Sequence, residues 1–149
     1  MQGLDNQVVV VTGGGGGIGG ATCRHFAKLG AKVAVFDMNL DTAKKVVQDI
    51  VSHGGQAHAF KCDITDRAMV DTAVQDVSTQ MGPIDVLVNN AGWDVFKPFI
   101  KTSPDDWSKL IAINLVGALH MHRAVLPGMA ERRKGRIINI ASDAARVGS

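Results

Sequence analysis

The sequence predicts an α/β fold, a Rossmann-type doubly wound parallel sheet with strand order 3-2-1-4-5. Three observations support this prediction. Strand-like and helix-like segments alternate along the chain, a run of glycines directly follows the first strand, and no internal repeat or low-complexity linker divides the chain. The 149 residues, 46% of them hydrophobic and 20% charged, have the size and composition of one globular domain. We therefore expect a single domain over residues 1–149.

The first three strands and two helices are predicted from short apolar runs that end at glycines or polar residues. Residues 8–11 are four valines, a β-branched run that suits a strand buried on both faces. A helix over residues 18–29 follows, in which Phe26 and Leu29 continue the apolar face begun by Ile18, and Gly30 ends it. The same reasoning predicts a strand at 32–36, a helix at 41–50 and a weaker strand at 57–61.

In the second half of the chain, capping residues mark where helices begin. Asp66 is placed to cap a helix that runs through Val77. Ser103 begins another helix, with a hydroxyl cap, a proline in the first turn and two carboxylates near the positive end of the helix dipole. This helix is expected to extend to Val125. Strands are predicted at residues 86–88 and 136–140, and loops at 89–103 and 141–149.

The glycine run lies between the first strand and the first helix. Glycine there lets the backbone turn tightly and approach a pyrophosphate, while the start of the helix offers unpaired N–H groups. The run fits G-x-G-x-x-G in two registers, and it also fits T-G-x-x-x-G-x-G through Thr12, Gly13, Gly17 and Gly19. No Lys-Ser or Lys-Thr pair follows the glycines, which excludes a Walker phosphate loop. The alternative is a merely flexible loop.

Asp37 follows the second strand, about 20 residues after the glycines. A carboxylate at this position can accept hydrogen bonds from both ribose hydroxyls of an adenosine and would repel a 2′-phosphate. No arginine or lysine lies within the glycine loop to attract such a phosphate. The combination predicts NAD rather than NADP as the cofactor, and the alternative for Asp37 alone is a solvated acid at a strand end.

These segments together resemble the short-chain dehydrogenase/reductase family. The matching pieces occur in family order across essentially the whole chain: TGGGGGIG at 12–19, Asp63-Ile64, NNAG at 89–92, Asn114, and RIINIAS at 136–142. Longer strings, such as NNAGWDVFKPF at 89–99, look most similar to family members that act on cyclic 2-hydroxyacyl-CoA thioesters. The resemblance implies an NAD-dependent oxidoreductase that interconverts a secondary alcohol and a ketone.

The resemblance also implies a role for each matching residue. Those that would bind NAD are Gly13, Gly17, Ile18, Gly19, Asp37, Asp63, Ile64, Asn90, Ala91 and Gly92. Ser142 would orient the substrate and polarise its reacting oxygen, and Asn114 would hold a water in a proton relay. Taken alone, Asn114 is an ordinary polar group of a helix, Ser142 is a loop hydroxyl and Asp63 is a turn former.

The proton donor of that family is missing from this sequence. The resemblance implies a tyrosine, with a lysine four residues after it, on the helix that follows Ser142, and the sequence contains no tyrosine. We therefore expect the chain to be the N-terminal part of such an enzyme, without its later helices and strands, and to transfer no hydride alone. Two alternatives stay open: a short nucleotide-binding module without catalysis, and a Rossmann protein of another chemistry, such as a methyltransferase or an epimerase-like enzyme.

The net charge, the length of the apolar runs and the histidine spacing limit the classes of partner that we expect. The net charge of +2 argues against nucleic acid or an anionic membrane, and no uninterrupted apolar run approaches the roughly 20 residues that span a bilayer. His120 and His122 cannot share one face of a helix, so no metal site is expected. The expected partners are a small hydroxy or keto substrate, with a CoA thioester as one form, and further copies of the complete protein.

Two further interpretations concern location and the long loop. The two cysteines lack a metal-ligand or redox spacing, and the N-terminus lacks a signal peptide pattern, so a reducing cytoplasm is expected. Four residues of the long loop fit two interpretations equally, an apolar wall for the substrate and a packed loop: Trp93, Phe96, Pro98 and Phe99.

Overall fold

The computed structural model describes residues 3–142, which form a five-stranded parallel sheet with helices on both faces. The strand order is β3-β2-β1-β4-β5, which confirms the predicted fold class. The elements up to the last loop are β1 (Val8–Thr12), α1 (Gly17–Lys28), β2 (Lys32–Asp37), α2 (Leu40–Ser52), β3 (Gln56–Lys61), α3 (Arg67–Gln80) and β4 (Ile84–Asn89). They are followed by η1 (Phe99–Lys101), α4 (Pro104–Ile111), η2 (Ala112–Gly117), α5 (Ala118–Glu131) and β5 (Arg136–Asn139).

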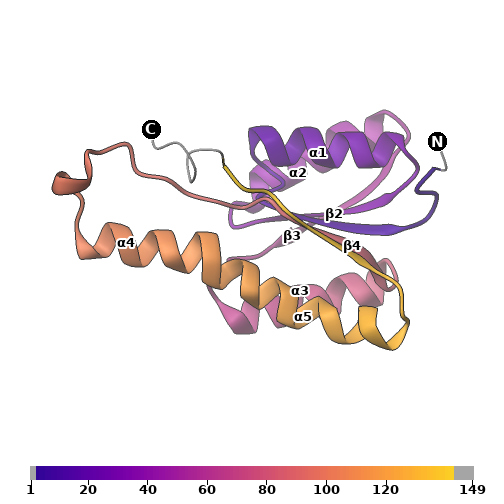
Figure 1. Cartoon of the computed structure of the whole chain (residues 1–149). Coiled ribbons are helices and arrows are strands. Elements are labelled where there is room, and N and C mark those ends of the chain that lie inside the picture. The colour runs from indigo at the N-terminus through magenta and orange to yellow at the C-terminus, as the bar shows by residue number, and fades with distance from the viewer. Residues whose placement is uncertain (1–2, 143–149) are drawn as a thin grey trace.

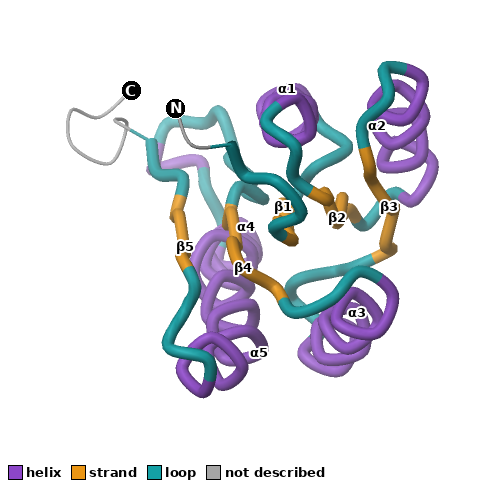
Figure 2. Tube along the Cα trace, turned by 90° about the vertical axis from the view of Figure 1, so that its right-hand side faces the viewer, coloured by secondary structure: helices purple, strands orange, loops and turns teal. Residues whose placement is uncertain are grey.

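The sheet separates two layers of helices, as Figures 1 and 2 show: α1 and α2 cover one face, and α3 and α5 cover the other. β1 pairs with β2 from Val8, which lies opposite Lys32. Val8 and Val10 belong to the core cluster on the α3 and α5 side, whereas Val9 and Val11 belong to the cluster beneath α1 and α2. The valine run is therefore apolar throughout because both of its faces are buried.

The chain from residue 104 to 131 is one continuous helical rod, longer than the predicted helix to Val125. α4 passes into the π-helical segment η2 and then into α5, which continues through Pro127. α5 buries Met121 and Val125 in the core, whereas none of the side chains of α4 is buried and α4 extends past the sheet (Figure 1).

The length of this rod, and a stretch of 18 residues within it that has a mean hydropathy of 1.3, would allow it to cross a membrane. Charged and polar residues interrupt the apolar residues of this rod, so the sequence pattern does not indicate such a segment. One such helix is weak evidence for a membrane span, because the core helix of a soluble protein can have the same length and composition.

The other predicted elements are confirmed with small shifts at their ends. β4 begins two residues earlier and ends one residue later than predicted, and β5 ends at Asn139. The loop after β4 contains the short 3₁₀ turn η1. Most of the predicted final loop, residues 143–149, lies outside the described residues.

Candidate functional site

A cleft of about 870 Å³ opens at the carboxyl ends of β1 to β4, between the start of α1 and the side of α4. Its volume lies within the usual range for ligand sites, and its position is where open α/β sheets bind ligands. All ten residues predicted to bind NAD line it: Gly13, Gly17, Ile18, Gly19, Asp37, Asp63, Ile64, Asn90, Ala91 and Gly92. The fold therefore brings together positions that are up to 79 residues apart in the sequence.

The start of α1 offers free backbone donors to this cleft. Its N-cap is Gly16, no side chain of the described residues caps it, and its first turn contains no acidic residue. The helices that follow β2 and β3 are capped by side chains. Asn39 accepts hydrogen bonds at the start of α2, and Asp66 does so at the start of α3. An uncapped helix start at a cleft is an anion-binding arrangement, because N–H groups and the helix dipole both favour negative charge.

The left-handed backbone of one glycine favours the register of the glycine run that includes it. Gly13 has φ +62°, a left-handed conformation that favours glycine. A Cβ at Gly19 would collide with the carbonyl oxygen of Gly13, so the helix approaches the turn closely. Nothing lies within 4 Å of a Cβ at Gly17, which faces open space in the cleft. The register through Gly13, Gly17 and Gly19 thus assigns two glycines to the turn and leaves one for the approach of a ligand.

Asp37 is fixed at the end of β2 by two backbone donors. The N–H of Gly15 donates to Oδ2 at 3.0 Å, and the N–H of Asn39 donates to Oδ1 at 2.9 Å. The carboxylate therefore ties the glycine loop to the second strand and still lines the cleft. Carboxylate oxygens can accept further hydrogen bonds, and the contact of Asp37 with an adenosine ribose stays a prediction.

Thr12 and Asn90 join the ends of β1 and β4 beneath the cleft. The Thr12 hydroxyl accepts hydrogen bonds from the backbone N–H groups of Asn90 and Ala91, both at 3.0 Å. The Asn90 side chain donates to the Thr12 carbonyl at 3.0 Å and to the Gly13 carbonyl at 3.4 Å. Asn90 therefore positions the glycine turn through the backbone. The role of Thr12 was not predicted, although the T-G pattern contained it.

Asp63 and Ile64 form the cleft wall after β3 and lie close to the helical rod. Asp63 Oδ1 accepts hydrogen bonds from the backbone N–H and the hydroxyl of Thr65, at 2.9 and 2.7 Å, which is the turn-forming role that the sequence left open. Ile64 is buried against Gly117 of η2.

Burial raises the pKa of the neighbouring Cys62 thiol to about 12, with further contributions from Asp63 and Asp66. The thiol is therefore neutral and is not a nucleophile at neutral pH.

The two predicted catalytic residues do not line the cleft. Asn114, in η2, accepts a hydrogen bond from the backbone N–H of Trp93 through Oδ1 and donates to the Trp93 carbonyl through Nδ2, both at 2.8 Å. Its side chain thus fixes the segment after β4, and Trp93 itself lines the cleft. Ser142 is exposed and lies three residues after the end of β5. The catalytic roles of both residues stay predictions.

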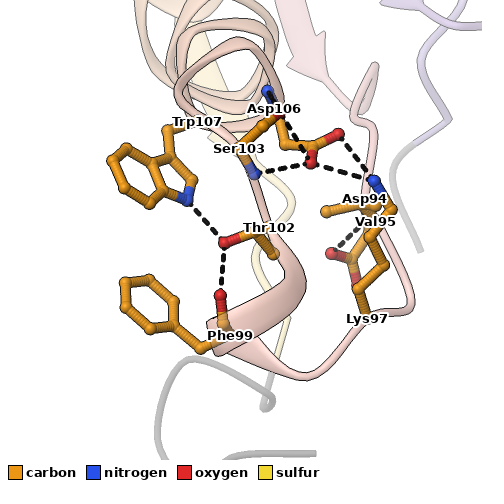
Figure 3. Close-up of polar contacts among 8 residues, drawn as sticks. All are labelled: Asp94, Val95, Lys97, Phe99, Thr102, Ser103, Asp106 and Trp107. Atoms are coloured by element: carbon orange, nitrogen blue, oxygen red, sulfur yellow. Dashed lines mark hydrogen bonds and ion pairs between the residues drawn. The ribbon is translucent and has the colours of Figure 1, made fainter.

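The loop after Trp93 is held by polar contacts of its own, shown in Figure 3. Ser103 and Asp106 form a capping box at the start of α4, and Lys97 forms an ion pair with Asp106 at 2.9 Å. Trp107 donates its indole N–H to the Thr102 hydroxyl at 2.7 Å. Phe96 and Phe99 are exposed, which argues against the interpretation of these two side chains as a packed loop interior.

Sequence reasoning missed several residues of the cleft. The lining also includes Met38, Thr65, Lys109, Ala112 and Ile113. Met38 and Thr65 directly follow predicted site residues and could have been found by that signal. The α4 and η2 residues reach the cleft only because the helical rod packs beside β4, which the local pattern does not show.

A metal site finds no support in residues 3–142. They contain no group of three or more histidine, cysteine or acidic side chains that could bind a metal ion. Nδ1 of His120 lies 2.9 Å from the Ile64 carbonyl oxygen, and Nδ1 of His122 lies 2.7 Å from the Ala118 carbonyl oxygen. The two imidazoles contact different parts of the molecule.

Comparisons with known proteins concern the family and the fold. The family model described as short chain dehydrogenase matches residues 7–149. D-threitol dehydrogenase of Mycolicibacterium smegmatis is 39% identical over 144 residues, which cover 97% of this chain and 55% of that protein. The hydroxy(phenyl)methylsuccinyl-CoA dehydrogenase subunit BbsD of Thauera aromatica is 36% identical over 142 residues, covering 95% of this chain and 57% of the relative. The chain thus spans about half the length of the curated relatives that it matches.

Two solved structures with the same fold contain a nicotinamide cofactor, NAD⁺ in one and NADP in the other. NAD⁺-bound xylitol dehydrogenase matches with a TM-score of 0.94 and 36% identity, over 98% of this chain and 56% of that chain. A metagenomic short-chain oxidoreductase in complex with NADP matches with a TM-score of 0.88 and 37% identity, over 93% of this chain and 63% of that chain. The cleft accordingly belongs to a fold that accommodates nicotinamide dinucleotides.

Proposed function

The chain belongs to the short-chain dehydrogenase family, and on that premise we propose that it provides the cofactor site of an NAD-dependent oxidoreductase that interconverts a secondary alcohol and a ketone. Residues 1–149 would form its nucleotide-binding Rossmann domain. The observation that carries this proposal is the uncapped start of α1, which faces a cleft lined by all ten residues of the predicted site.

The residues present fit a dinucleotide. The N–H groups at the start of α1 would bind its phosphates, and Asp37 would accept hydrogen bonds from the adenosine ribose. Asp63 and Ile64 would meet the adenine, and Asn90 would support the glycine turn from below. The chemistry that a bound nicotinamide supplies is hydride transfer.

The preference for NAD over NADP rests on Asp37. Its carboxylate carries a negative charge at the place where NADP has an additional phosphate, and like charges at short range repel. Two backbone N–H groups fix the carboxylate there, so it cannot turn away without the loss of both hydrogen bonds.

The catalytic step needs a proton donor that this polypeptide does not contain. Ser142 would polarise the substrate oxygen as a hydrogen-bond donor, and Asn114 would belong to the proton relay. With no tyrosine among its 149 residues, we propose that this chain binds the dinucleotide and transfers no hydride by itself.

For the substrate we propose a small hydroxy or keto compound, with a cyclic 2-hydroxyacyl-CoA thioester as the most specific form. Support comes from the sequence strings at 89–99 and from the CoA thioester named for the relative BbsD. A polyol is the second candidate, because D-threitol and xylitol are named for other relatives.

We also propose that the complete protein forms a homo-oligomer and lies in the cytoplasm. A stripe of exposed apolar side chains on the helical rod, comprising Ile111, Leu115, Leu119 and Leu126, supports a homo-oligomer in the complete protein. Cys23 and Cys62 are buried, unpaired and in core clusters on opposite sides of the sheet, which supports a reducing cytoplasm.

The proposed cofactor is tested by calorimetric titration of the purified chain with NAD, NADP and S-adenosylmethionine. We expect saturable binding of NAD, with NADP at least tenfold weaker and no binding of S-adenosylmethionine. Stronger binding of NADP would contradict the role of Asp37, and binding of S-adenosylmethionine alone would favour a methyltransferase.

A further inference from the structure

Lys109 differs from the other charged residues of the cleft. Asp37 and Asp63 are the other charged side chains among the described residues that line it, and both accept hydrogen bonds from neighbouring residues. Lys109 is therefore the only cationic side chain that the described part of the chain presents to the cleft. An anionic ligand in the cleft would meet its ammonium group as the one full positive charge that residues 3–142 place there.

The ammonium group of Lys109 forms no ion pair with any carboxylate of residues 3–142. Asp105 precedes it by four residues on α4, the spacing and order that favour an ion pair on a helix. Four other basic side chains of the described residues do form ion pairs, Arg24–Asp49, Arg67–Asp71, Lys97–Asp106 and Lys134–Asp85. Lys109 instead places Nζ 4.0 Å from the centre of the Trp93 ring.

Trp93 holds this ammonium group at the cleft because its own backbone is fixed. Asn114 forms hydrogen bonds with both the N–H and the carbonyl of Trp93. A cation over an indole ring is stabilised by about 0.5–1 kcal/mol at an exposed site, and the aromatic face does not neutralise its charge. The charge thus stays available to a ligand, beside an apolar surface.

We propose that Lys109 and Trp93 form a binding site for an acidic group of the substrate, a carboxylate or a phosphate, whose apolar part contacts the indole. The inference rests on the proposed function and deepens it by naming the substrate class. Lysine binds such oxyanions through charge-assisted hydrogen bonds. A neutral polyol would gain nothing from this charge.

The phosphates of the cofactor are the other possible source of an oxyanion. The N–H groups at the start of α1 already provide for them, and α1 lies on the other face of the sheet from the helical rod that contains Lys109. The acidic group that Lys109 binds is therefore assigned to the second ligand.

The test uses Trp93 fluorescence in the chain with Trp107→Phe, which leaves Trp93 as the only tryptophan. The probes are benzoate and its neutral analogue benzamide, titrated with and without saturating NAD. Lys109→Met removes the charge and Lys109→Arg retains it. Lys101→Met is the matched control, because Lys101 lies in η1 and does not line the cleft. Circular dichroism checks that each variant is folded.

We expect saturable binding of benzoate, at least tenfold weaker binding of benzamide, and a tenfold or greater loss of benzoate affinity in Lys109→Met. Lys109→Arg should retain most of the affinity and Lys101→Met all of it. Equal benzoate affinity in Lys109→Met, or no saturable binding of benzoate, would overturn the proposal.

The NAD titration separates this result from the proposed function. If Lys109→Met weakens NAD and ADP-ribose but not benzoate, Lys109 serves the cofactor phosphates and the inference is wrong. If NAD does not bind but benzoate binding depends on Lys109, the oxyanion site stands and the proposed cofactor fails.

Discussion

The starts of α4 and α1 differ in whether side chains bind their first backbone N–H groups. Each leaves backbone N–H groups without partners inside the helix. At the start of α4, Ser103 and Asp106 satisfy them with a capping box, and Lys97 adds an ion pair. At the start of α1, Gly16 offers no side chain and no acidic residue follows in the first turn.

The difference shows where the chain leaves interactions to a ligand. α4 begins in an exposed loop, where Ser103, Asp106 and Lys97 complete the helix start. α1 begins at a cleft, with a turn built by close glycine contacts and with Asp37 beside it. An unsatisfied helix start within a well-determined turn therefore indicates a binding site, whereas a capped start indicates local stability.

The largest effect is expected from changes in the glycine turn itself. In Gly19→Ala the new Cβ would overlap the Gly13 carbonyl oxygen and lie 2.7 Å from Asn90 Nδ2, so the turn must move. We expect a loss of about 2–3 kcal/mol in the free energy of unfolding, as for other overpacked sites, and loss of NAD binding. Urea unfolding and calorimetry measure the two quantities.

Gly17→Ala is the matched control for that variant. Its Cβ would meet nothing within 4 Å, so the stability should stay within about 0.5 kcal/mol of the wild type. NAD binding should nevertheless weaken, because the methyl group projects into the space left for the ligand. Equal destabilisation in the two variants would disprove the assignment of the glycine register.

The next effect concerns the charge beside the α1 start. Asp37→Asn removes the carboxylate charge and keeps an acceptor oxygen for one of the two backbone N–H groups, those of Gly15 and Asn39, that Asp37 binds. We expect NAD affinity to fall about tenfold, because charge-assisted hydrogen bonds to the ribose are lost. Discrimination against NADP should fall as well, because the repulsion of its 2′-phosphate is removed. Titrations with both cofactors measure the ratio, and an unchanged ratio would refute the role given to Asp37.

A smaller effect, confined to stability, is expected at the capped start of α4. Ser103→Ala removes the side chain that accepts the Asp106 backbone N–H, at a cost of about 1 kcal/mol. The melting temperature should fall by about 3 °C. The NAD affinity should not change. A loss of NAD binding in a folded Ser103→Ala sample would show that the two helix starts are coupled.

The smallest effect is a dependence of stability on pH. The side-chain hydrogen bond from Lys97 and the hydrogen bonds from Ser103 lower the pKa of Asp106. A carboxyl group whose pKa is lower in the folded state stabilises the fold above its unfolded value of about 3.9, and this contribution is lost as the pH falls through the folded value.

We therefore expect the wild type to be more stable than Asp106→Asn at pH 6 and the two to converge below pH 3. Thermal melts between pH 6 and pH 2.5 measure this, with Asp105→Asn as control because Asp105 accepts no hydrogen bond from Ser103 or Lys97. A stability difference that does not change with pH would contradict this account of Asp106.

Most of the fold could be predicted because its signals are local. The valines of β1, the cap of α3 by Asp66 and the start of α4 at Ser103 depend on residues close in sequence. The glycine turn and Asp37 are predictable for the same reason. Helix ends were less certain: the rod continues past Val125 because its apolar face packs on the core, and a proline near its end does not interrupt it.

The rest of the site depends on contacts between distant segments. The two hydrogen bonds between Asn114 and Trp93 join residues 21 positions apart, and Asn114 lies in the π-helical segment η2. The approach of Lys109 to Trp93 follows from that arrangement. No periodicity in the sequence encodes such a pairing, so sequence reasoning could name Asn114 only through the family resemblance.

The central claim is that the uncapped start of α1 is left open for the cofactor phosphates, and Gly16→Asp tests it most directly. A Cβ at Gly16 meets only the Gly13 carbonyl oxygen, at 3.5 Å, so the side chain fits. The new carboxylate would cap the helix, as Asp66 does for α3, and stabilise the fold by about 0.5 kcal/mol. It would also occupy the N–H groups and repel the phosphates, so we predict at least a hundredfold loss of NAD affinity by calorimetry. Unchanged NAD affinity in a stable Gly16→Asp chain would contradict the claim.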